Sequence, residues 1–202
     1  MGAVILLLIA AAVWAGSVWF FWRSGAWLPY YLIGSAGSAI LIVVGCRELP
    51  IQDWLQAFTA ESVHFASAFI GVKTSTTHLQ AGDLLVVGFS HGHQWTDMTI
   101  GLECSGLLEG AALCGLIAFF PAYSMKRRAG IMGIALLATF IANIIRVMVI
   151  VGVVAYVGQA WLQFAHVVLG RVVFFALAIG IYWFAVTRPT LRAVGSRIRS
   201  QA

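Results

Sequence analysis

Charged side chains are scarce in this chain of 202 residues. Lysine, arginine, aspartate and glutamate make up 9% of the sequence, whereas hydrophobic residues make up 61%. Soluble domains carry about 25% charged residues, so this chain cannot cover a soluble surface with polar groups. The composition excludes an ordinary soluble protein and predicts a polytopic membrane protein.

Cysteine is also rare. The three cysteines are Cys46, Cys104 and Cys114. An odd number of thiols at apolar positions excludes a disulfide framework. No linker, low-complexity segment or internal repeat divides the chain, so we predict one integral membrane domain over residues 1–202. A basic segment followed by a small-residue cleavage site is missing near the N-terminus, so we expect a retained membrane span there.

Long apolar runs dominate the remainder of the sequence. Five of them are long enough to cross a hydrocarbon core of about 30 Å, which predicts an all-α polytopic membrane protein with about five transmembrane helices. Two lie within residues 1–46 and three within residues 101–187. They cover Gly2–Trp22, Trp27–Cys46, Leu102–Pro121, Ala129–Val157 and Trp161–Val186.

The segment Ile51–Val72 has a helical pattern in which aromatic residues alternate with polar ones such as Asp53, Glu61 and His64. Charged groups near the middle of a span are costly in lipid. We therefore predict an amphipathic helix that lies in the outer interface. The alternative is a third span, which gives six spans and an inner N-terminus.

Residues 73–100 form the one long polar stretch. Leu79–Val87 and Gln94–Ile100 have patterns typical of β-strands, and Gly88–Gly92 lies between them, so we predict a hairpin or a small extended flap in an outer loop. Its residues His91, His93 and Asp97 suggest zinc or copper ligands, but their spacing is not specific for a metal. We predict no metal and no cofactor.

Basic residues indicate the orientation of the spans. Lys126, Arg127 and Arg128 form the densest basic loop, and the tail 188–202 is the other basic region. Because short cytoplasmic loops are rich in Lys and Arg, we place both inside, in a multi-pass cell membrane protein with a cytoplasmic C-terminus. The net charge of +5 then predicts contact with the lipid bilayer, not with nucleic acid.

This topology brings three reactive residue types to one depth. Cys104 lies at the outer mouth of its span, and His166 lies a few residues into the last span. Arg146 follows Arg128 by eighteen residues, which is about 27 Å of helix and most of a bilayer core. Ionisable residues inside spans are costly, so we predict a functional site near the outer face.

Three segments at these spans carry a family resemblance. Glu103-Cys-Ser-Gly106, Asn143-Ile-Ile-Arg146 and His166-Val-Val-Leu-Gly170 resemble, in that order, the exosortase/archaeosortase family of membrane-embedded, sortase-like cysteine enzymes. The resemblance covers about residues 50–186 and is closer to the compact bacterial branch. It implies that Cys104 is the nucleophile, that Arg146 is the active-site arginine, and that His166 is the third catalytic residue.

The resemblance also leaves a choice for the third catalytic role. Archaeal relatives have an arginine there, and Arg171 is nearby, but it lies five residues deeper than His166. We therefore favour His166, which is a suitable proton carrier near neutral pH. Arg146 stays protonated, so its expected work is to hold a carbonyl or an oxyanion. The Cys104 thiolate is expected to form a thioester.

Other polar residues have supporting roles in this prediction. Asn143 lies one turn before Arg146 and is expected to orient it. Glu109 is expected to pair with Arg146 or Arg171 inside the membrane. Glu103, Ser105 and Gly106 flank the nucleophile, and no physical role for Glu103 follows from the sequence.

The substrates implied by the resemblance are membrane-anchored proteins with a C-terminal sorting tail, which consists of a short motif, an apolar helix and a basic end. The alternative is a non-catalytic membrane partner or small transporter of a cell-surface or exopolysaccharide assembly system, with Arg146, Glu109 and His166 along a polar path. The oligomeric state does not follow from the sequence.

Overall fold

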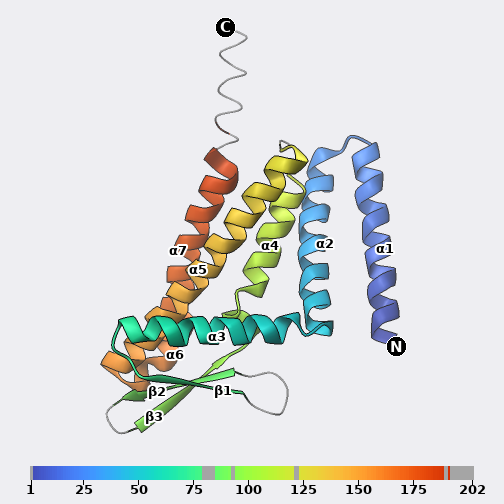
Figure 1. Cartoon of the computed structure of the whole chain (residues 1–202). Coiled ribbons are helices and arrows are strands. Elements are labelled where there is room, and N and C mark those ends of the chain that lie inside the picture. Colours follow the sequence, from blue (N-terminus) through green and yellow to red (C-terminus); the bar gives the residue numbers. More distant parts are fainter. Residues whose placement is uncertain (1, 79–84, 92–93, 121–122, 189–190, 192–202) are drawn as a thin grey trace. The chain divides into compact units, whose positions relative to one another are not determined.

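The computed structural model describes residues 2–78, 85–91, 94–120, 123–188 and 191. Figure 1 shows a mostly helical chain with one small β-sheet. The long helices are α1 (Gly2–Arg23), α2 (Trp27–Glu48), α3 (Ile51–Phe69), α4 (Leu107–Ala118), α5 (Met125–Val157) and α7 (Gly170–Tyr182). Shorter helical turns are η1 (Leu102–Cys104), η2 (Gln159–Trp161), α6 (Leu162–Phe164), η3 (Ala165–Leu169) and η4 (Trp183–Thr187).

The helical content and the apolar helices confirm an all-α polytopic membrane protein. Among the described residues, four helical stretches are long and apolar enough to cross a membrane. They are Ile5–Arg23, Trp27–Glu48, Met125–Val157 and Gln159–Thr187. The amphipathic helix α3 is not one of them, so the structure gives no support to the alternative of a further span there.

The expected span Leu102–Pro121 is shorter in the structure. Its first residues form the turn η1, and the helix α4 has 12 residues. At 1.5 Å per residue, α4 is about 18 Å long, which is well below the thickness of a hydrocarbon core. The prediction of a full-length helix from Leu102 was therefore wrong, because the chain turns at Gly101–Gly106 before the helix begins.

The described chain clusters into two compact units. One contains residues 1–48, 108–137 and 182–202, and the other contains residues 49–107 and 138–181. The single domain expected over residues 1–202 stays a prediction. Cys104, Asn143, Arg146 and His166 all belong to the second unit.

Small residues allow helices to approach closely within the first unit. Gly115 on α4 packs against the Ser35 carbonyl and the Ser38 hydroxyl of α2, and a methyl group on Gly115 would collide with both. This is the close approach that small residues in membrane helices permit. The Tyr123 hydroxyl also donates a hydrogen bond of 2.6 Å to the Ala185 carbonyl. Arg188 stacks over Phe184, while residues 192–202 of the basic tail lie outside the described residues.

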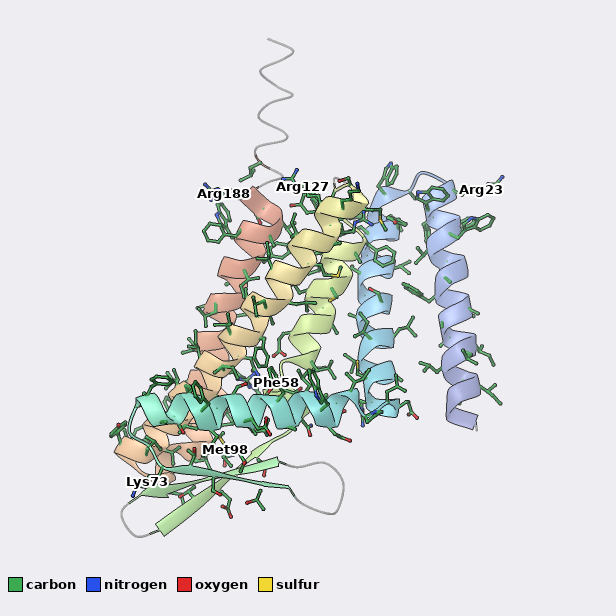
Figure 2. The ribbon with its side chains drawn as sticks, viewed as in Figure 1. Arg23, Phe58, Lys73, Met98, Arg127 and Arg188 are labelled. Carbon is green, nitrogen blue, oxygen red and sulfur yellow. The ribbon has the colours of Figure 1, made fainter. Side chains whose placement is uncertain are left out.

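The second unit contains α3 and the sheet. The buried face of α3 contributes Ala60 and Val63 to a core that also contains Met98 and Ile100 of the sheet. Its opposite face exposes large aromatic side chains, and one of these, Phe58, stacks on Phe140 of α5. Figure 2 shows Phe58 and Met98 on opposite sides of α3. The aromatic face agrees with an interfacial helix, and its place in the bilayer stays a prediction.

The predicted flap is a three-stranded antiparallel sheet in the order β1-β2-β3. Its strands are β1 (Thr74–His78), β2 (Leu85–His91) and β3 (Gln94–Ile100), and α3 lies along them (Figure 1). Gln94–Ile100 is a strand as predicted. Gly88 belongs to β2, not to the predicted turn at residues 88–92, because it pairs with both Ser75 and Asp97. Residues 79–84 of the other predicted strand lie outside the described residues.

Candidate active site

Cys104 lies in a tight turn between β3 and α4. Gly101 continues the strand in an extended conformation, and its carbonyl accepts hydrogen bonds from the Cys104 and Ser105 amides at 3.0 and 3.1 Å. The Ser105 hydroxyl donates to the Leu102 carbonyl at 2.8 Å and accepts from the Leu107 amide at 3.3 Å. Ser105 thus fastens the turn to the start of α4, where the first amides of a helix need acceptors.

Gly106 completes the turn with φ of +74°. An L side chain rarely adopts this conformation, and a methyl group at Gly106 would lie 3.3 Å from the Asn143 side chain. Both constraints require glycine. The turn therefore holds Cys104 close to α5, and the Cys104 side chain is only 2% exposed.

His166 contacts Cys104, although the two residues are 62 positions apart in the sequence. The Cys104 Sγ atom lies 3.0 Å from the His166 Nε2 atom. His166 is in η3, which is a π-helical turn, and such turns are frequent at functional sites. Gly170, just after η3, packs against Ile150 of α5, where a methyl group would lie 2.9 Å from the Ile150 Cδ1 atom. The small residue allows the segment that contains His166 to pack closely on α5.

Asn143 is completely buried on α5 and contacts the Cys104 backbone. Its Nδ2 atom donates a hydrogen bond of 2.7 Å to the Cys104 carbonyl. The Asn143 Oδ1 atom has no hydrogen-bond partner among the described residues. The expectation that Asn143 orients Arg146 stays a prediction, and the hydrogen bond in the structure is with the turn that contains the nucleophile.

Arg146 lies one helical turn after Asn143 and is 3% exposed. Its guanidinium carbon lies 5.8 Å from the centre of the Phe174 ring on α7. A cation over an aromatic face is stabilised by the ring quadrupole, especially when water is excluded. Sequence reasoning missed Phe174, although its position eight residues after His166 places it about two turns further along the same helical stretch.

The Cys104 thiol thus lies beside His166, which can act as a base, on a turn that is bonded to the buried Asn143 amide. The buried Arg146 lies on the same helix as Asn143. A family model described as "Transmembrane exosortase (Exosortase_EpsH)" matches residues 1–184. The chain belongs to the transmembrane exosortase family. No curated protein and no solved structure matches it.

Glu103 and Glu109 are the two acidic residues near the nucleophile, and only Glu109 has an expected role. The Glu103 backbone is part of η1, and its side chain lies outside the described residues. Glu109 is half-buried in the first turn of α4 and belongs to the first unit, whereas Arg146 and Arg171 belong to the second. Arg171 is exposed on α7. The expected pairing of Glu109 with either arginine therefore stays a prediction.

The candidate metal ligands His91 and His93 have no described side chains, so the histidine-rich loop lies largely outside the described residues. No group of three His, Cys, Asp or Glu side chains comes together among those residues. The side chains of His78 and His91, and all of His93, lie outside them. His64 is described, and its Nδ1 atom lies 2.7 Å from the Thr74 hydroxyl oxygen at the start of β1.

Proposed function

We propose that this chain is a membrane-embedded cysteine transpeptidase or protease that cleaves C-terminal sorting tails of secreted proteins on the outer face of the membrane. Membership of the transmembrane exosortase family supports a membrane exosortase-type role. The observation that carries the chemical assignment is the 3.0 Å separation between the Cys104 Sγ and His166 Nε2 atoms. Hydrogen-bond reach between a nucleophile and a base is the first geometric requirement for covalent catalysis.

The acylation step follows from this pair. His166 accepts the proton of the Cys104 thiol, and the thiolate attacks a peptide carbonyl carbon of the tail. The carbonyl π electrons move to oxygen, and Arg146 stabilises the resulting oxyanion. As the intermediate collapses, the C–N bond breaks, the nitrogen receives the proton from His166, and a thioester to Cys104 remains.

The second step releases the product. An amine or a water molecule loses a proton to His166 and attacks the thioester carbonyl. The C–S bond then breaks, and the proton returns to the Cys104 sulfur. An amine acceptor gives transpeptidation, whereas water gives hydrolysis. The turn places Cys104 three residues before α4, where the positive end of the helix dipole favours a thiolate.

Co-expression with a tail-bearing protein tests this function. The substrate is a secreted protein from the same genome that ends in a short motif, an apolar helix and an arginine-rich end. We expect wild type to shorten it, and we expect C104A and His166→Ala to lower the cleavage rate at least about a hundredfold, which is the low end of the contribution of a general base.

The matched controls are C46A and C114A, since these free thiols lie on α2 and α4 and belong to the first unit, whereas Cys104 and His166 belong to the second. Both should cleave the tail at the wild-type rate. Cleavage by C104A at the wild-type rate would remove Cys104 from the chemistry. No cleavage of the tail by wild type would favour the non-catalytic or transport alternative.

A further inference from the structure

The strand β3 forms one edge of the sheet. It pairs with β2 over seven consecutive residue pairs, from Leu85 with Ile100 to His91 with Gln94. In the order β1-β2-β3, the other side of β3 has no strand partner among the described residues. Alternate backbone N–H and C=O groups of an edge strand point away from the sheet and are free to pair with another chain.

This edge lacks most of the usual protections against such pairing, and Asp97 is its one charged residue. Proteins block exposed edges with proline, lysine, a bulge or a covering element. Gln94–Ile100 contains no proline and no lysine, and its pairing with β2 is uninterrupted. Thr96, Met98 and Ile100 are buried, whereas Asp97 and Thr99 are exposed. Among the described elements, β3 pairs with β2 and one of its faces contacts α3, while its other edge has no strand partner there.

The opposite edge is tied to the rest of the unit. Thr74, the first residue of β1, has its hydroxyl 2.7 Å from both the Ser67 Oγ atom and the His64 Nδ1 atom of α3. β1 also has five residues, whereas β3 has seven. The two edges are therefore not equivalent: β1 is bonded to α3 through Thr74, and β3 is the longer strand.

The open edge also leads directly to the nucleophile. Gly101 extends β3 with φ of −87° and ψ of −170°, and Cys104 follows within the turn that begins there. A peptide paired along Thr96–Ile100 covers about 17 Å at 3.4 Å per residue. Its next residues then reach the level of the Cys104 turn. Edge and nucleophile are thus parts of one continuous segment of the chain.

We infer that the β3 edge binds the extended segment of the substrate beside the scissile bond, as a fourth strand of the sheet. The inference rests on the proposed function, since it assumes a peptide substrate at Cys104. Pairing through main-chain groups holds about five residues with little demand on their sequence, and pockets for alternate side chains add selectivity. The occupant is an unfolded stretch of polypeptide, which a sorting tail supplies ahead of its apolar helix.

A pair of positions in one row of the sheet provides a matched test. Thr99 of β3 and Thr77 of β1 both pair with Val86 of β2, which lies between them in the sheet. Both threonines are exposed. In full-length C104A, the photocrosslinking amino acid p-benzoylphenylalanine replaces Thr99 in one variant and Thr77 in another. Each variant is co-expressed with the same tail-bearing protein, and C104A leaves that protein uncleaved.

We expect crosslinks from position 99 to the tail, at least about tenfold more abundant than those from position 77, and mapped beside the cleavage site of wild type. In a catalytically intact chain, Thr99→Lys should raise KM about tenfold with little change in kcat, because lysine opposes edge pairing. Thr77→Lys should leave both constants unchanged.

Equal crosslinking from the two positions, or crosslinks from position 99 mainly to a second copy of this chain, would overturn the inference. So would an unchanged KM in Thr99→Lys. The wild-type cleavage assay separates the two proposals. Cleavage by wild type without crosslinks at position 99 would contradict the β3 binding site but not the proposed function. Crosslinks at position 99 without cleavage by wild type remove the function and leave a peptide-binding edge.

Discussion

Asn143 illustrates how a single buried side chain fixes the candidate site at the scale of the residue. It is fully buried, and it donates a 2.7 Å hydrogen bond to the carbonyl of Cys104. A methyl group added at Gly106, two residues after Cys104, would lie 3.3 Å from the Asn143 side chain. The Asn143 amide therefore restrains the turn through this hydrogen bond, and we expect it to position the nucleophile.

Asn143→Ala should lower kcat about fivefold with little change in KM, because the lost hydrogen bond contributes about 1 kcal/mol and the Cys104 carbonyl is left without that donor. Steady-state kinetics on the tail substrate measure the effect. Ile145→Ala is the control, since Ile145 lies on the same helix and is exposed. An equal fall in kcat for both variants would indicate a general loss of helix packing and not a role at the turn.

The sequence predicted part of this residue-scale picture. Cys104 and His166 were expected at one depth from the charges of the loops, and the structure brings their side chains into contact. The hydrogen bond from Asn143 to the Cys104 carbonyl could not be predicted from the sequence, because a side chain on α5 can contact any group that tertiary packing places opposite it. Arg146 over Phe174 was missed for the same reason.

The turn between β3 and α4 is the decisive feature at the scale of the element. It changes the chain from strand to helix within six residues, and it shortens the apolar helix that the hydropathy of Leu102–Pro121 predicted. Hydropathy reports burial in lipid and not backbone direction, so the turn was not visible in it. The Ser105 hydrogen bonds and the positive φ of Gly106 make this change of direction possible.

Gly106→Ala should therefore lower the free energy of unfolding by about 1–2 kcal/mol, which is the cost of a left-handed conformation for a residue with a side chain. It should also lower cleavage, since the Asn143 side chain must move. Reversible unfolding in mixed detergent micelles measures the first effect. Gly133→Ala on α5 is the control, because no heavy atom lies within 4 Å of the added carbon and its φ is helical. Stability of Gly106→Ala equal to that of Gly133→Ala would show that the turn is not strained.

Strand β1 and turn η3 could not be predicted from the sequence patterns either. Thr74–His78 has no alternation of apolar and polar residues, and its strand conformation depends on pairing with β2. Such pairing is a contact between distant parts of the chain, and residue preferences in strands depend on that context. The π-helical turn at His166 lies inside an apolar run in which an ordinary helix has the same sequence pattern.

The orientation of the spans is the prediction at the scale of the whole molecule. The basic residues Lys126, Arg127 and Arg128 are all at the start of α5, and Arg188 follows η4. If both regions are cytoplasmic, the sheet and Cys104 face the outside. This was derived from charge alone, and the helical architecture agrees with several spans without assigning their sides.

Labelling in intact cells tests the orientation. In a background with Cys46, Cys104 and Cys114 replaced by alanine, Thr77→Cys on the exposed side of β1 should react with a membrane-impermeant maleimide. Lys126→Cys at the start of α5 should react only after the membrane is permeabilised. The opposite pattern, with Lys126→Cys labelled in intact cells, would place the sheet inside and exclude a site on the outer face.

The covalent state of Cys104 during turnover shows whether this cysteine is the nucleophile. Wild type incubated with the tail-bearing substrate and quenched in acid should carry the N-terminal part of that substrate on the peptide that contains Cys104, as measured by mass spectrometry. Neutral hydroxylamine should release this adduct, as it releases a thioester, and C104A should not form it. Rapid cleavage with no adduct on Cys104, or an adduct that survives in C104A, would contradict the assignment of Cys104 as the nucleophile.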